Sequence, residues 1–318
     1  MNSELVVAKK LLEQGDVIAI PTETVYGLAA NAFNQEAVSK IYAIKERPLF
    51  NPLIVHIKAS SYLETIAQNI PPKAWQLATA FWPGPLTLVL EKKEIIPKIV
   101  TSGNETVAVR IPSHPIALEL LHHLDFPLAA PSANPFGYIS PTCSQHVKKQ
   151  LGDKISLVVE GGICSKGIES TILGFDNFEP VLYRVGAISK EEIEAVIGTI
   201  QIKNKSTTLP QAPGMLSKHY APKTRFVIST DLSKSIEENR NKKVGYLLFS
   251  NQNYGLNSKQ FIQLSTENNL SEAAQKLYAA MHELDDQNLD LIVAERFPDI
   301  GIGISLNDRL QRAQETNF

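Results

Sequence analysis

The chain has 318 residues, of which 43% are hydrophobic and 20% are charged, and its formal net charge is -2 at pH 7. This length predicts about two domains. Because the net charge is slightly acidic, the molecule as a whole carries no basic field, and binding to nucleic acid would have to depend on a local patch.

The N-terminus and the cysteines indicate the compartment. The first residues, MNSELVVAKKLLEQGD, mix charges with helical periodicity, which is not the pattern of a secretory signal peptide. Cys143 and Cys164 are the only cysteines, and their spacing is neither that of a disulfide scaffold nor that of a Cys-x-x-Cys pair. No apolar run approaches the roughly 18 to 20 residues that span a bilayer. We therefore expect a cytoplasmic protein without membrane association.

Helices and strands alternate along residues 1–197, which we predict to be the first domain. Helices are expected at residues 4–14, 38–44, 72–81, 143–151 and 190–197. Strands are expected at residues 17–20, 53–57, 86–90, 106–111, 128–130, 157–159, 171–175 and 181–185. Ser61 and Glu64 have the spacing of a capping box for a further helix. Because hairpin-like neighbours occur beside helix-linked strands, the sheet is predicted to be mixed rather than purely parallel.

Residues 198–222 are predicted to be a linker, because they are polar and then interrupted by Pro210, Pro213 and Pro222. The linker contains the string PGMLSKHYAP, although solvated spacers seldom need Met, His and Tyr together. Residues 223–318 alternate strands and helices in the manner of a small doubly wound, Rossmann-like α/β unit. The chain is therefore predicted to have two α/β domains joined by an unusually specific linker.

Several common catalytic motifs are missing from the sequence. It contains no Gly-x-x-x-x-Gly-Lys-Ser/Thr loop, no His-Glu-x-x-His and no Gly-x-Ser-x-Gly. P-loop hydrolysis of nucleotides, zinc proteolysis and lipase-like acylation therefore lack support. His122 and His123 are adjacent on a predicted helix and cannot converge on one metal ion, so we expect them at the surface.

Short polar clusters lie instead at the ends of strands or in the loops after them. They comprise Thr22-Glu23-Thr24, Lys45-Glu46-Arg47, Asn51, His56, Arg110, Ser132-Ala133-Asn134, Ser140, Ser170-Thr171 and Arg184. Strand ends border the ligand crevices of layered α/β folds. Arginine forks and a lysine charge at such a place suit phosphates or a carboxylate. The pattern indicates a site for an anionic ligand.

Each cluster also has a purely structural interpretation. Thr22 and Thr24 could bond only to the backbone of their turn, and the Ser132 cluster could cap a helix. Arg110 and Arg184 could pair with surface carboxylates. The joint recurrence of polar residues after apolar strands favours the site.

Longer motifs then point to one family. PTETVYGL, KERP followed by NPLIVHI, TVAVRIPSHP, APSAN, ESTI and YRVG resemble, in this order, the threonylcarbamoyl-AMP synthase family with its YrdC-like core domain. PGMLSKHYAP followed by a further α/β unit is similar to the longer, two-domain form of that enzyme. One departure is Pro135-Phe136-Gly137 after APSAN, where the family commonly has Ser-Gly.

The resemblance implies a twisted, open, mixed α/β sheet, and an enzyme that makes threonylcarbamoyl-AMP and pyrophosphate from L-threonine, bicarbonate and ATP. This activity would class it as a nucleotidyltransferase. The product serves threonylcarbamoylation of the tRNA adenosine next to the anticodon, by a downstream tRNA threonylcarbamoyl transferase complex. Mg²⁺ is implied as a companion of the ATP phosphates, with no metal held by the protein itself.

The resemblance also implies roles for particular residues. Threonine would be bound by Thr24, His56, Arg110, Ala130 and Ser170. ATP would be bound by Arg47, Asn51, Thr106, Ser132, Ser140, Arg184 and His219. Lys45 and Arg47 would be catalytic by offsetting phosphate charge. The linker with His219 would close over the nucleotide as a lid.

Two other functions stay open at this point. A concave basic surface of this fold would also suit a double-stranded RNA-binding or ribosome-maturation module, although the acidic net charge disfavours this as the primary role and leaves only weak RNA binding. Carbamoyl transfer from carbamoyl phosphate, as in larger relatives of the domain, would need zinc-finger-like parts that two cysteines cannot make.

Overall fold

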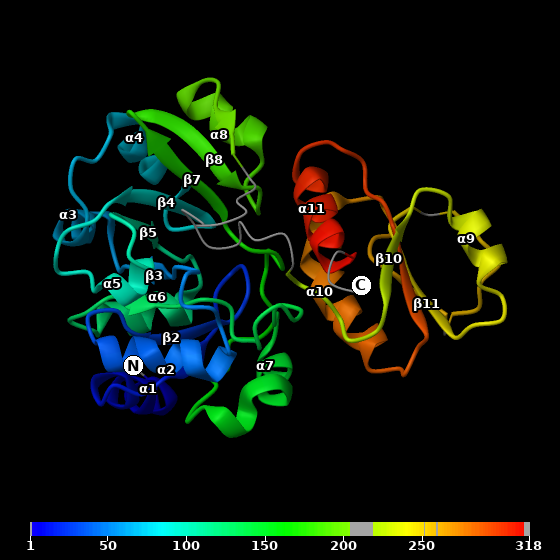
Figure 1. Ribbon diagram of the computed structural model, residues 1–318, viewed down its shortest axis with the longest axis horizontal. Coiled ribbons are helices and arrows are strands. Elements are labelled where there is room, and N and C mark those ends of the chain that lie inside the picture. The colour runs from blue at the N-terminus through cyan, green and yellow to red at the C-terminus, as the bar shows by residue number, and fades with distance from the viewer. Residues whose placement is uncertain (1, 204–218, 251, 259, 315–318) are drawn as a thin grey trace.

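In the computed structural model, which describes residues 2–203, 219–250, 252–258 and 260–314, a nine-stranded mixed sheet forms the larger of two α/β units (Figure 1). Its strands, in the order in which they lie across the sheet, are β1 (Ile18–Ile20), β2 (Gly27–Asn31), β6 (Leu128–Ala129), β3 (Ile54–His56), β5 (Thr106–Arg110), β4 (Leu86–Glu91), β7 (Thr171–Asp176), β8 (Glu179–Arg184) and β9 (Gln201–Ile202). The pairs β3–β5, β4–β7 and β8–β9 are parallel, and the other neighbours are antiparallel. The predicted mixed sheet is confirmed.

Helices cover this sheet and connect its strands. They are α1 (Ser3–Glu13), α2 (Gln35–Lys45), α3 (Leu63–Ile66), α4 (Pro72–Phe81), α5 (Lys98–Thr101), α6 (Pro115–His122), α7 (Ser144–Leu151) and α8 (Lys190–Ile197), with 3₁₀ turns at Ser60–Tyr62 and Gly152–Lys154. The main core lies between the sheet and these helices and includes Leu28, Ile41, Val55 and Val109. Within the described ranges, no helix is long and apolar enough to cross a bilayer.

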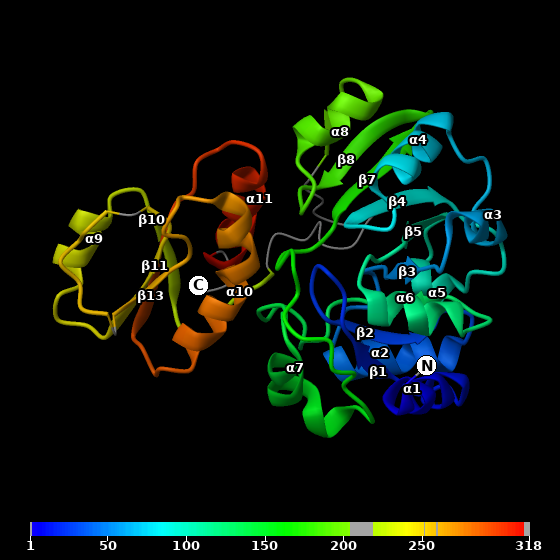
Figure 2. The ribbon, with the colours of Figure 1, turned by 180° about the vertical axis from the view of Figure 1, so that it is seen from behind.

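The smaller unit is a four-stranded parallel sheet, in the order β10 (Phe226–Ser229), β13 (Leu291–Glu295), β11 (Val244–Leu248) and β12 (Phe261–Gln263). Helix α9 (Leu232–Glu238) lies on its outer face, and α10 (Leu270–Asp285) and α11 (Ile302–Gln314) lie on the face turned to the large unit (Figures 1 and 2). The predicted second, Rossmann-like unit is confirmed.

The two units share one apolar cluster. It joins Val25 and Ile168 of the large unit to Leu277, Met281 and Leu310 on helices α10 and α11. Because this contact buries side chains from both units, the small domain is docked against the large one rather than merely tethered to it. The docked face is next to the pocket described below.

Local differences from the sequence prediction have physical reasons. Ser61 lies inside the 3₁₀ turn and caps nothing by its side chain, whereas Ser189 and Glu192 form a true capping box at α8. Val158 makes only a single bridge to Ala19, so residues 157–159 are not a regular strand. The first sheet also continues past residue 197, because β9 pairs with β8.

Candidate active site

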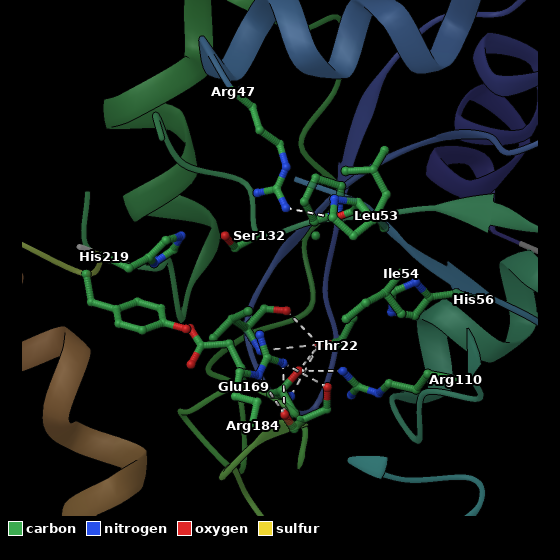
Figure 3. Close-up of a pocket in the computed structure, with 18 residues that line it drawn as sticks. Thr22, Arg47, Leu53, Ile54, His56, Arg110, Ser132, Glu169, Arg184 and His219 are labelled. Carbon is green, nitrogen blue, oxygen red and sulfur yellow. Dashed lines mark hydrogen bonds between the residues drawn. The ribbon is translucent and has the colours of Figure 1, made fainter. Parts of the chain in front are cut away.

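A pocket at the carboxyl ends of the central strands collects most of the predicted site residues. Figure 3 shows Arg47, Arg110, Arg184 and His219 converging on it from different elements. The free volume enclosed between these side chains is about 60 Å³, and the whole space within the pocket, including the part open to solvent, is about 600 Å³. His219 and the adjacent Tyr220 close it on the side of the small domain.

The turn after β1 forms the floor of the pocket. Thr22 Oγ1 donates to the carbonyl oxygen of Val25 at 2.6 Å and accepts the backbone N–H groups of Thr24 and Val25. Thr22 therefore has the structural role that was the alternative interpretation of this cluster. Thr24 Oγ1 instead accepts a hydrogen bond of 2.9 Å from Arg110 Nη1, so the turn is attached to the neighbouring guanidinium.

Arg110 lies at the end of β5, where it is 3% exposed, and so it is not a surface residue. Its Nη2 lies 2.6 Å from Glu23 Oε1, and its Nε donates to the carbonyl oxygen of Gly84. Neither Arg110 Nη2 nor the carboxylate oxygens of Glu23 have a well-aligned hydrogen bond within the described structure. The pair therefore presents both a positive and a negative group whose hydrogen-bonding capacity is not used up.

His56 stands beside Arg110 because β3 and β5 are parallel and these two residues are in register. Burial, and then the charge of Arg110, lower the pKa of His56 to about 3. The imidazole is therefore neutral at pH 7, and its Nδ1 has no hydrogen-bond partner among the described residues. A neutral ring next to a guanidinium can bond to a hydroxyl or amino group of a ligand without adding charge.

This pKa predicts how stability depends on pH. The folded form takes up no proton at His56 above about pH 4, whereas the unfolded chain does so below its ordinary pKa of 6.5, so stability is lost as the pH falls from 6.5. We expect His56 alone to cost about 2 kcal/mol of unfolding free energy between pH 7 and pH 5. Urea unfolding of His56→Gln at both pH values measures it, with exposed His122→Gln as the control. An equal pH dependence in wild type and His56→Gln would contradict the assigned pKa.

The turn that follows helix α2 places one more cation, Arg47, at the other end of the pocket. The helix ends at Glu46, whose left-handed φ of 54° turns the chain so that Arg47 enters the pocket. Arg47 Nε donates to the carbonyl oxygen of Asn51 at 3.0 Å and its Nη2 to that of Pro52 at 2.8 Å. No carboxylate lies within 4 Å of Arg47 among the described residues. A buried charge with only carbonyl partners favours an anionic ligand.

The loop after β6 and the loop before β7 complete the wall of the pocket. The first of them contributes Ala130 and Ser132, and the second contributes Ser170. Arg184, at the end of β8, donates through Nε and Nη2 to the carbonyl oxygen of Ser170, and through Nη2 also to Ser170 Oγ. The structure thus brings together Thr24, Arg47, His56, Arg110, Ala130, Ser132, Ser170, Arg184 and His219.

Comparison with known proteins identifies this arrangement. The family model Sua5/yciO/yrdC, described as "Telomere recombination", matches residues 10–186, and "Threonylcarbamoyl-AMP synthase, C-terminal domain" matches residues 188–314. Threonylcarbamoyl-AMP synthase of Pyrococcus abyssi is 40% identical over 96% of this chain and 93% of its own length. That of Bacillus subtilis is 41% identical over 98% and 93%. The chain belongs to the threonylcarbamoyl-AMP synthase family.

The crystal structure of P. abyssi Sua5 complexed with L-threonine is also similar to this synthase-family chain. The TM-score is 0.91 at 39% sequence identity, and the match covers 98% of this chain and 94% of that one. The structural similarity therefore extends over both domains, in agreement with the two-domain form that the sequence motifs indicated.

Four residues that the synthase motifs predicted do not line the pocket. Lys45 is buried behind it, where its Nζ donates to the carbonyl oxygens of Ser132 and Asn134. Asn51 carries an amide group without a hydrogen-bond partner in the described structure, and Ser140 Oγ donates to Glu169 at 2.7 Å. Thr106 begins β5, whereas Arg110 ends it, which separates them by roughly 13 Å. The contacts predicted for these four stay predictions.

Two residues of the pocket, Glu169 and Tyr220, were not predicted as site residues, and appeared only as letters of the ESTI and PGMLSKHYAP motifs. Glu23 was listed in the Thr22-Glu23-Thr24 cluster but was given no role, and it pairs with Arg110 beside the pocket. The available signal was a carboxylate directly before or between hydroxyl residues of a synthase motif. Tyr220 has a φ of 67°, which is uncommon for an aromatic residue and is typical of strained functional segments.

The predicted lid is only partly described. Residues 213–218 of PGMLSKHYAP lie outside the described residues, whereas His219 and Tyr220 lie at the pocket. The His219 ring makes an edge contact with Phe136 at 5.8 Å between centroids. Phe136 belongs to the Pro135-Phe136-Gly137 segment, which differs from the usual synthase sequence. One residue of this unusual segment therefore contacts His219.

Proposed function

We propose that this chain synthesises L-threonylcarbamoyl-AMP from L-threonine, bicarbonate and ATP with release of pyrophosphate, as a nucleotidyltransferase. The observation that carries the proposal is the pocket with three guanidinium groups, of which Arg110 faces Glu23 and Arg47 has only carbonyl partners. A pocket of this kind suits one zwitterion and one polyanion, which are the charges of threonine and ATP.

Threonine fits the end of the pocket at Arg110. Its carboxylate would accept hydrogen bonds from Arg110, and its amino group would donate to Glu23, because both groups retain unused bonding capacity. The neutral His56 and Thr24 would bond to the threonine hydroxyl or amine. Ala130 and Ser170 line the same space and would orient the amino acid.

ATP fits the end at Arg47. The guanidinium of Arg47 would bind phosphate oxygens, with Ser132, Arg184 and His219 along the same wall. Mg²⁺ would be held by the phosphates and water, because Glu23 and Glu169 are already paired with Arg110 and Arg309. In the parts of the chain that the structure describes, no group of three or more His, Cys, Asp or Glu could hold a metal ion.

The proposed reaction needs no protein nucleophile. The threonine amine and bicarbonate combine, with loss of water, to N-carboxythreonine. An oxygen of its new N-carboxy group, not of the α-carboxylate, attacks the α-phosphorus of ATP in line with the departing pyrophosphate. The protein would contribute positioning and stabilisation of phosphate charge, mainly through Arg47. Lys45 would act indirectly, by fixing the loop that carries Ser132. Closure by His219 and Tyr220 would keep water from the carbamate and the adenylate.

A direct assay tests this function. The purified protein is incubated with ATP, Mg²⁺, L-threonine and ¹⁴C-bicarbonate, and we expect pyrophosphate release that depends on threonine, together with a labelled adenylate. Omission of threonine or bicarbonate serves as the control. Tight binding of double-stranded RNA without any turnover would favour the RNA-binding module instead.

The destination of the product and the setting of the enzyme are further parts of the proposal. The adenylate would pass to a tRNA threonylcarbamoyl transferase complex, which modifies the adenosine next to the anticodon. A cytoplasmic location and weak binding of RNA stay predictions from the sequence.

A further inference from the structure

Arg309 on α11 is a fully buried arginine whose contacts cross from the small domain to the pocket wall of the large domain. Its Nε lies 2.8 Å from Glu169 Oε2, its Nη2 donates to the carbonyl oxygen of Val185 at 2.8 Å, and its guanidinium lies 5.1 Å from the ring centroid of Tyr220. Glu169 and Tyr220 both line the pocket, and Val185 follows Arg184 directly. One guanidinium from the small domain therefore contacts the wall at three points.

Glu169 is held away from the other arginines by these contacts. Ser140 Oγ donates to its Oε1, and Tyr278 on α10 donates to its Oε2 at 3.0 Å. Burial acts to raise the pKa of Glu169, but the charges of Arg309 and then Arg184 outweigh it, so that the pKa lies below its ordinary value and the carboxylate is ionised. The chain thus places a buried negative charge in the wall of a pocket that is suited to an anion.

Arg184 competes for that negative charge. It is close enough to Glu169 for their charges to interact, yet no ion pair within 4 Å joins them, whereas Arg309 and Glu169 are paired at 2.8 Å. All the hydrogen bonds that Arg184 makes within the described ranges use Nε and Nη2 and go to Ser170, so its Nη1 stays available. Without Arg309, the carboxylate of Glu169 would turn to Arg184, the other cation whose charge acts on it.

We propose that Arg309 is a positioning residue of the synthase site: by holding Glu169, it leaves Arg184 free to bind the anionic nucleotide. This inference rests on the proposed function and adds a role for the small domain, which supplies the counter-charge of the pocket wall. Ser305 on the same helix supports the arrangement, because its Oγ donates to the carbonyl oxygen of Gly186 at 2.8 Å. Helix α11 is thereby anchored along the segment that follows Arg184.

The test is a suppressor experiment on the full chain. In Arg309→Met, Glu169 pairs with Arg184, and we expect the KM for ATP to rise about tenfold while the KM for threonine changes less than about threefold. In Glu169→Gln/Arg309→Met the competing carboxylate is gone, and the KM for ATP returns to within about threefold of that of Glu169→Gln alone. The double variant also removes the buried, uncompensated carboxylate that Arg309→Met leaves, so the selectivity for ATP decides between the two roles. A purely structural role of Arg309 would raise the KM for threonine as much as the KM for ATP.

Controls separate the inference from folding and from the proposed function. Lys149→Met removes another ion pair between the two domains, that with Asp286, at an exposed position away from the pocket, and is expected to leave both KM values unchanged. If Arg309→Met does not fold, Tyr278→Phe removes a second donor to Glu169 without removing a charge, and its KM for ATP is expected to rise about threefold.

The outcomes are distinct. A wild-type chain without threonine-dependent pyrophosphate release rejects the proposed function. If the wild type turns over, an unchanged KM for ATP in Arg309→Met, or in Tyr278→Phe where Arg309→Met does not fold, overturns the role of Arg309 and leaves the proposed function standing. No recovery of the KM for ATP in the double variant has the same meaning.

Discussion

Substitution of Arg47 by alanine is expected to lower kcat/KM for ATP by about two to three orders of magnitude, the size of effect seen when one preorganised donor to a developing charge is removed. The guanidinium is buried, its pKa is lowered to about 10 chiefly by that burial, and its described partners are two carbonyl oxygens. Phosphate is the partner that compensates such a charge. Initial rates of pyrophosphate release against ATP concentration, at saturating threonine, measure the effect.

One further variant shows whether Arg47 acts through its paired N–H donors or through its charge alone, and a second variant is the control. Arg47→Lys keeps the charge but loses the paired donors, and we expect it to recover only part of the lost activity. Arg296→Ala removes an exposed arginine that pairs with Asp299 on the small domain, and full activity is expected. Kinetics of Arg47→Ala equal to those of the wild type would remove Arg47 from the site.

Much of the fold could be predicted because its signals are local. Apolar periodicity indicated most strands, and the helix expected at residues 72–81 agrees with α4, where Pro71 is the N-cap. β9 could not be predicted in this way. Its two residues are exposed, and only the edge of β8 makes them a strand. The same dependence on a partner explains why residues 157–159, with one bridge to Ala19, are not regular.

The same distinction between local and long-range signals holds for the residues of the site. Residues at the ends of strands, such as His56 and Arg110, could be grouped from the sequence because strand ends meet at one edge of a sheet. The role of Glu169 depends on Tyr278 and Arg309, which lie 109 and 140 positions further along the chain. Nothing local in a single sequence indicates such a contact. Lys45 shows the converse, since its position in KERP indicated a phosphate contact, whereas its ammonium group is directed to two carbonyl oxygens.

Substitution of Arg110 is expected to have an equally large effect, but on the KM for threonine rather than on the KM for ATP. Arg110→Ala on its own would leave Glu23 as a buried, uncompensated carboxylate and cost about 3 to 5 kcal/mol of stability, which would obscure the kinetics. Glu23→Gln/Arg110→Ala removes both charges, and the Glu23→Gln single variant is its matched reference.

These two variants differ only at residue 110, because both carry Glu23→Gln. The Arg110 guanidinium lies beside Thr24 and Glu23, at the end of the pocket where we propose that the threonine carboxylate binds. We expect the KM for threonine to rise about 100-fold and the KM for ATP to change less than about threefold, since a charge-assisted hydrogen bond contributes about 1.5 to 3 kcal/mol and a bidentate fork contributes more than one of them. Steady-state kinetics with each substrate varied in turn give both values. Equal increases in the two KM values would mean that Arg110 supports the pocket as a whole rather than binding the amino acid.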